Sequence, residues 1–103
     1  MGEWYSATPN ADGGTTERWL TLREGGTGER RLVATGPRAG TLVSSAEWRR
    51  AGDYEVPLYC ESVNGSTESC EGIPRLDTTC RPDASGAELA CAAESGVVVY
   101  ARQ

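Results

Sequence analysis

Residues 15–36 read TTERWLTLREGGTGERRLVATG, and this stretch decides the fold class. Its centre, Glu24-Gly25-Gly26-Thr27-Gly28-Glu29, is rich in glycine, which supplies the backbone freedom that a tight turn requires. The residues on either side include Thr, Val and Trp, which are typical of β-strands. The stretch therefore predicts a hairpin between strands at 15–24 and 29–36.

The same pattern continues along the rest of the chain. Gly, Ser, Thr and Pro interrupt it roughly every eight to twelve residues, a spacing typical of many short antiparallel strands. We predict an all-β fold, either a small antiparallel meander barrel or a β-sandwich, of about eight strands with one short helix and two disulfides. Residues 1–103 form a single domain, and its strands are expected at 3–8, 15–24, 29–36, 40–45, 54–61, 67–70, 87–92 and 96–102.

The short helix is predicted at 45–51. Ser44 and Glu47 have the spacing of a capping box, and Gly52 stands where a glycine is expected to end a helix. Trp48 is expected to fill the core from this segment.

The cysteines are expected to supplement a thin core. The chain has no Phe and only one Ile, so it buries little large apolar surface. It also has no His and no Cys-x-x-Cys spacing, so a zinc site would have to use all four thiolates, and disulfides are favoured. Disulfides place the protein outside the reducing cytosol, as a secreted, periplasmic or extracellular domain.

The turns predict which cysteines pair. If residues 64–66 form a three-residue hairpin loop, Cys60 lies opposite Cys70. If residues 85–86 form a two-residue loop, Cys80 lies opposite Cys91. We therefore expect the disulfides Cys60–Cys70 and Cys80–Cys91. The triplet at Asn64 is also a glycosylation sequon, and whether it is used stays open.

Charge and composition exclude several partners. The net charge of −5 argues against a nucleic acid, which needs a basic face. The doublets Arg30-Arg31 and Arg49-Arg50 lie close to Glu29 and Glu47, which indicates a solvated surface of mixed charge. No apolar run is long enough to span a membrane, and no segment has the pattern of a signal peptide, so we expect a mature domain. All the basic residues are Arg, which we interpret as the codon bias of a GC-rich, bacterial genome.

The residue types also argue against an enzyme. Without His or Lys the usual ways of activating a serine are missing, and paired cysteines offer no thiolate. The fifteen acidic residues present no pair that can be singled out for carboxylate catalysis. We therefore expect no catalytic residue, no cofactor and no metal.

Two residues at the ends of the chain suggest how a barrel would close. Trp4 follows Gly2 in a Gly-x-Trp sequence on the first strand, and Arg102 ends the last strand. The first and last strands of a closed meander are neighbours, so Arg102 is expected to stack on Trp4 and plug one end. With the strand count, these residues resemble the calycin superfamily, which includes lipocalins, avidins and bacterial inhibitors of secreted metalloproteases. The resemblance implies a small eight-stranded barrel.

A second functional lead is the sequence Ile73-Pro74-Arg75-Leu76. It lies in a predicted loop at 71–79, which Cys70 and Cys80 would hold at its ends. A restricted loop loses little entropy on binding, as in substrate-like protease inhibitors. In a trypsin-like enzyme Arg75 would enter the acidic specificity pocket, Pro74 would keep the backbone extended, and Ile73 would fill the next subsite. The alternative is a surface connector in which Pro74 fixes a turn.

We therefore predict a secreted, non-enzymatic binding protein, with inhibition of an extracellular protease through 71–79 or a barrel end as the first hypothesis. The alternatives are a small-ligand carrier, with a cavity lined by Trp4, Tyr5, Trp19 and Tyr100, or an exported adhesion or immunity module. A filled interior would exclude the carrier. The residues expected to fill it are Leu20, Leu22, Val33, Val56, Leu58 and Leu89.

Overall fold

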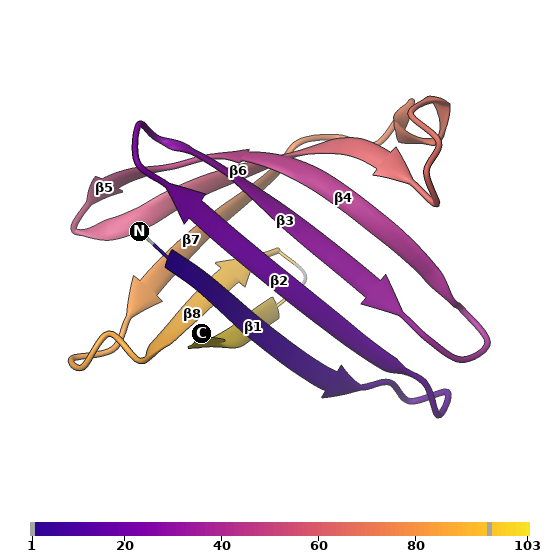
Figure 1. Ribbon diagram of the computed structural model, residues 1–103, viewed down its shortest axis with the longest axis horizontal. Helices are drawn as coiled ribbons and strands as arrows, with labels where there is room; N and C mark the ends of the chain where they lie inside the picture. The colour runs from indigo at the N-terminus through magenta and orange to yellow at the C-terminus, as the bar shows by residue number, and fades with distance from the viewer. Residues whose placement is uncertain (1, 95) are drawn as a thin grey trace.

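The computed structural model describes residues 2–94 and 96–103 (Figure 1). Over these residues the chain forms nine strands and one 3-10 turn. They are, in order, β1 (Gly2–Pro9), β2 (Thr15–Arg23), β3 (Thr27–Ala34), β4 (Gly40–Glu47), β5 (Arg49–Ala51), β6 (Asp53–Val63), η1 (Glu68–Cys70), β7 (Leu76–Pro82), β8 (Glu88–Ala93) and β9 (Gly96–Arg102). No helix in this part of the chain has the length and apolar character needed to cross a membrane.

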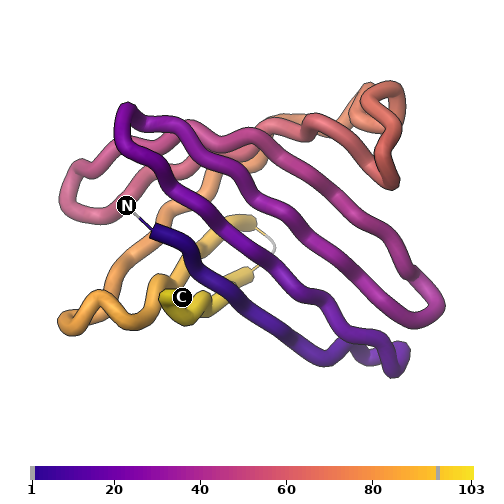
Figure 2. Tube along the Cα trace, viewed as in Figure 1, coloured from indigo at the N-terminus to yellow at the C-terminus, as the bar shows by residue number. Residues whose placement is uncertain are grey.

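The strands form one closed antiparallel barrel. Their order is β4-β3-β2-β1-β9-β8-β7-β6-β5, and β4 also pairs with β6, which completes the ring. β4 and β5 are successive parts of one strand interrupted at Trp48, so the ring contains eight strands. The tube in Figure 2 shows β1 beside the C-terminal strand, where Trp4 and Arg102 are register partners. The barrel alternative is therefore confirmed over the sandwich.

The glycine-rich turn at 24–29 is confirmed. β2 and β3 pair from Thr16 opposite Ala34 to Arg23 opposite Thr27. Gly25 and Gly26 have φ angles of 91° and 86°, which side chains other than glycine rarely adopt. Because this register is continuous, every second residue of each strand points into the barrel.

The predicted helix at 45–51 is wrong. Residues of β4 pair with β3 on one side and β6 on the other, so the two ladders override a local capping signal. Gly52, with a φ angle of 84°, turns the chain from β5 into β6 instead of ending a helix. Trp48 still packs against the core, and its Nε1 donates a 2.7 Å hydrogen bond to the carbonyl of Arg23.

Both predicted disulfides are present, although one of the two registers is wrong. Cys80 and Cys91 are register partners on β7 and β8, as the predicted turn requires. Cys70, bonded to Cys60, lies on η1, because residues 67–70 do not form the expected strand. The expected loop at 71–79 is also shorter, because β7 begins at Leu76, which pairs with Leu58.

The core follows the inward face of the strands. Its fully enclosed side chains lie on opposite walls of the barrel, and the Cys80–Cys91 disulfide is among them. The largest side chains that are less than 2% exposed are Leu22, Leu89, Val56 and Cys80. The disulfide therefore takes the place of a large apolar residue in the core of a chain that has no Phe.

Candidate functional site

Arg102 lies over Trp4 where the first and last strands of the barrel pair. The guanidinium carbon of Arg102 lies 5.4 Å from the centre of the Trp4 ring, and Trp4 as a whole is 4% exposed. A Cβ atom at Gly2 would lie 3.1 Å from Nη2 of Arg102, so the glycine leaves room for the guanidinium. The predicted contact between Trp4 and Arg102 is present, and it explains the Gly-x-Trp spacing.

The interior of the barrel is not completely filled. A cavity of about 230 Å³ is lined by residues of β2, β3, β6, β7, β8 and β9. Its apolar wall includes Leu20, Leu32, Leu58, Leu76 and Val98. Of the six residues expected to fill the barrel, five are buried; the prediction is wrong for Val33, which shares the outer face of β3 with Arg31. The interior therefore has both a packed core and a hollow part.

The polar side of the cavity carries positive charge. Arg18 on β2, Arg30 on β3 and Tyr100 on β9 all line it. The register places Leu20 opposite Arg30 and Arg18 opposite Leu32, so the two arginines are diagonal neighbours on the inward face. Arg18 donates a 3.4 Å hydrogen bond to Oγ1 of Thr8, one of the last residues of β1.

Burial perturbs the two deeper groups of this cluster. It lowers the pKa of the Arg30 guanidinium, an effect opposed by the contact with Tyr100 and increased by the charge of Arg18. Burial likewise raises the pKa of the Tyr100 hydroxyl, against the opposing effects of Arg30 and Arg18. Both shifts have the sign expected for ionisable groups held away from water.

The positive charge has no carboxylate beside it. Among the residues that line the described part of the cavity there is no Asp or Glu. Nε of Arg30 and Oγ1 of Thr78 are both buried without a hydrogen-bond partner in the described structure. The ion pairs found within residues 2–94 and 96–103 lie at the surface and use other arginines, namely Arg23, Arg49, Arg75 and Arg81.

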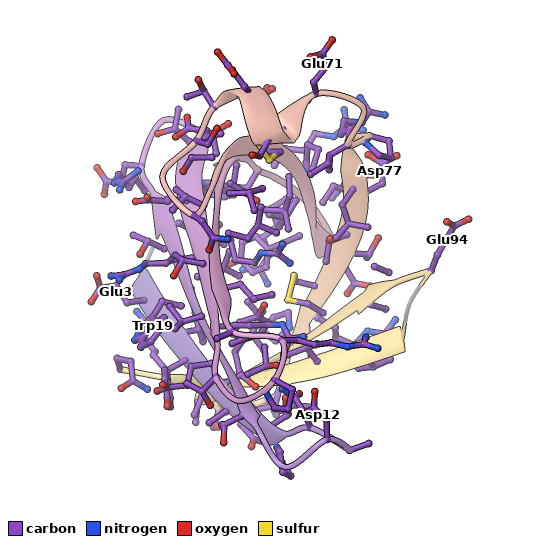
Figure 3. All side chains as sticks on the ribbon, turned by 90° about the vertical axis from the view of Figure 1, so that its right-hand side faces the viewer. Glu3, Asp12, Trp19, Glu71, Asp77 and Glu94 are labelled. Atoms are coloured by element: carbon purple, nitrogen blue, oxygen red, sulfur yellow. A yellow bond between two sulfur atoms is a disulfide. The ribbon has the colours of Figure 1, made fainter. Side chains whose placement is uncertain are left out.

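Two of the four residues expected to line a ligand cavity point outward. Trp4 and Tyr100 are both buried, but of these two only Tyr100 is among the described residues that line the cavity. The Tyr5 and Trp19 rings instead contact each other on the outer face, with centroids 5.3 Å apart, and Figure 3 shows Trp19 on the flank of the barrel. The cavity prediction is therefore wrong for Trp4, Tyr5 and Trp19. Tyr5 and Trp19 occupy the outward positions of their strands.

The predicted inhibitory residues follow η1 in the chain and lead into β7. Ile73 is 45% exposed, and residues 71–75 connect η1 to β7. Nε of Arg75 lies 2.8 Å from a carboxylate oxygen of Asp77, and hydrogen bonding to Asp77 raises the pKa of Arg75. Leu76 belongs to β7 and contacts the core. The segment therefore presents Ile73, Pro74 and Arg75 outside the barrel, but not Leu76.

Arg18 and Arg30 were not predicted as site residues. The prediction of a solvated surface for the Arg30-Arg31 doublet is wrong for Arg30. Successive residues of a strand point to opposite faces, so Arg30 enters the barrel while Arg31 lies outside, 5.7 Å from the centre of the Trp19 ring. The signal that could have found Arg18 is the alternation along β2, because Arg18, Leu20 and Leu22 are alternate residues and therefore share one face of the strand.

Comparisons with known proteins identify no relative of this barrel. No family model matches the chain, and neither a curated protein nor a solved structure matches it.

Proposed function

We propose that this chain is a secreted, non-enzymatic binding protein that holds a small molecule inside its barrel. The observation that carries the proposal is the cavity of about 230 Å³ beside Leu58, Leu76 and Val98. A filled interior would have left no room for a ligand. The cavity therefore favours the small-ligand carrier over the protease inhibitor, which was the first hypothesis from the sequence.

The size of the cavity limits the ligand. A volume of about 230 Å³ corresponds to about eight water molecules in the liquid. Sites for drug-sized ligands usually measure about 300 to 1,000 Å³, so the molecule held here is smaller. The mixture of apolar side chains with a few polar groups is typical of binding sites for small molecules.

Two further features support the proposal. The closed antiparallel ring, with Arg102 over Trp4, has the general form of a calycin barrel, and we propose that the chain belongs to that superfamily. The two disulfides support an extracellular or periplasmic location, because such bonds persist mainly in oxidising compartments.

The proposal is tested with hexanol, a small neutral molecule with an apolar tail. Methyl NMR spectra recorded during a hexanol titration should show shifts for Leu58, Leu76 and Val98 but not for Val97, which is 66% exposed. Substitution Ala93→Phe fills the cavity and should abolish the shifts. Its neighbour Ala92 is exposed, so Ala92→Phe is the matched control. Unchanged cavity methyls in the wild-type protein would contradict the proposal.

Protease inhibition is the second candidate. It is supported by the tethering of residues 71–75, because Cys70 is bonded to Cys60 at one end and β7 joins the sheet at the other. Such a segment loses little conformational entropy when a protease binds it. The ion pair between Arg75 and Asp77 opposes this function, since Arg75 must leave Asp77 before it can enter a specificity pocket.

A further inference from the structure

The arginines inside the barrel lack a negatively charged partner. Arg30 lines the cavity with a buried Nε that makes no hydrogen bond, and Arg18 is its diagonal neighbour on β2. The carboxylates of Glu71 and Glu94 extend away from the barrel in Figure 3. A second observation, independent of Arg30, is that Thr78 on the facing wall also holds a buried polar atom without a partner.

This arrangement is unfavourable for the empty protein. A cation held away from water loses hydration, and the cost is normally offset by a paired charge with good hydrogen bonds. Two neighbouring cations raise the cost further because they repel each other. A bound anion would offset the repulsion and give the Nε of Arg30 a hydrogen-bond partner in one step.

We propose that the cavity binds a small monocarboxylic acid with an apolar tail. Its carboxylate accepts hydrogen bonds from the guanidinium of Arg30 and the hydroxyl of Tyr100. Its tail lies against Leu58, Leu76 and Val98. This inference rests on the proposed function, because it names the chemistry of the molecule held in the same cavity.

The chemistry of the wall favours a carboxylate over other anions. The planar guanidinium fork matches the two oxygens of a carboxylate. A phosphate monoester group carries about −1.5 to −2 charge and three acceptor oxygens at neutral pH, so moving it from water into a partly apolar cavity costs more than moving a carboxylate. The same apolar half is suited to a hydrocarbon tail, which gains free energy in proportion to the surface it buries.

Three probes of equal chain length separate the charge from the tail. Isothermal titration calorimetry of the intact, oxidised protein compares hexanoate, hexanol and hexylamine, with acetate and inorganic phosphate as anions that lack a tail. Hexanoate should bind at least about 10-fold more tightly than hexanol, which is the range for a hydrogen bond to a charged group. Hexylamine should bind most weakly of the three, because its ammonium group is repelled by Arg18 and Arg30.

The role of Arg30 is tested with the variant Arg30→Leu. Hexanoate affinity should fall to that of hexanol, while hexanol affinity is kept. The urea midpoint should not fall, because the variant removes a half-buried charge that has no carboxylate beside it among the described residues that line the cavity. Arg31→Leu is the matched control, since Arg31 is the next residue and lies on the outer face. If Arg30→Leu does not fold, Arg30→Lys keeps the charge without the planar fork and should weaken hexanoate alone.

The outcomes separate this inference from the proposed function. If hexanol binds and hexanoate binds no more tightly, the anion site is wrong and the cavity proposal stands. If Arg30→Leu weakens both probes equally, Arg30 only maintains the shape of the cavity, and the inference is again wrong. If no probe shifts the cavity methyl groups, both proposals are wrong.

Discussion

Arg102 lies across from Trp4 at the junction of β1 and β9, with its guanidinium carbon 5.4 Å from the ring centre. The backbone at the same place also bonds across the junction, because the amide of Gln103 donates to the carbonyl of Glu3 at 2.8 Å. The ends of the chain therefore meet through a stacking contact and through the sheet itself.

Substitution Arg102→Ala removes the stacking contact and leaves the backbone bonds in place. We expect the free energy of unfolding to fall by about 1 kcal/mol, the usual contribution of a cation over an aromatic ring at a partly exposed site. Urea unfolding followed by tryptophan fluorescence measures the change. Arg38→Ala, on an exposed turn, is the control and should leave the free energy unchanged. A loss no larger than that of the control would mean that the contact does not stabilise the junction.

The two disulfides should differ in their contribution to stability. Each closes a loop of similar length, with sequence separations of 10 and 11, and the chain-entropy model gives about 3 kcal/mol for either. Cys80 and Cys91 are also buried, so replacing both with Ala leaves a cavity in the core. The double variant Cys80→Ala/Cys91→Ala should therefore lose more free energy of unfolding than Cys60→Ala/Cys70→Ala.

Partial reduction gives an independent test of the same difference. A thiol must reach a sulfur atom to break a disulfide, and Cys60 and Cys70 are less buried than Cys80 and Cys91. Mass mapping should show the Cys60–Cys70 bond reduced first. Simultaneous loss of both bonds would contradict the difference in burial.

The fold class could be predicted from local signals because each turn contains residues, mainly glycine, that are typical of a turn. Gly25 and Gly26 identify the β2–β3 hairpin, and the turn near Gly86 places Cys80 opposite Cys91. The segment 45–51 could not be predicted in this way, since its capping residues suit a helix and only pairing with β3 and β6 makes it extended.

The candidate site was harder to predict than the fold. A strand residue points in or out according to the phase of its strand, and a shift by one residue exchanges the two faces. The sequence shows two adjacent arginines, Arg30 and Arg31, and their separation requires the register of β3 against β2. The same phase decides that Trp19 is outside and Leu20 inside.

The buried hydroxyl of Tyr100 should make stability depend on alkaline pH. Burial raises the pKa of Tyr100 in the folded protein, whereas an unfolded tyrosine titrates near pH 10, about its usual value. As the pH rises above about 10, the unfolded chain loses this proton first, so the free energy of unfolding falls until the folded pKa is passed. Urea midpoints measured between about pH 8 and 11 should fall less steeply for Tyr100→Phe than for the wild type. Equal slopes would show that another group causes the decrease.

Arg75 provides the test of protease inhibition. Its side chain is 54% exposed and paired with Asp77, which is 69% exposed. The ion pair between them therefore costs little to open, because exposed pairs contribute at most about 1 kcal/mol.

If residues 73–75 bind in the substrate site of a trypsin-like protease, the intact protein should slow trypsin hydrolysis of a small chromogenic substrate. Arg75→Ala should abolish the inhibition with a loss of about 2 kcal/mol or more, as for the anchor of an interface, while the urea midpoint is unchanged. Asp77→Asn should strengthen inhibition, because the guanidinium of Arg75 is then released from its ion pair. Rapid cleavage after Arg75 without inhibition would show that the segment is an accessible substrate and not an inhibitor, since tethering by Cys70 would then have failed to hold the cleaved ends in place.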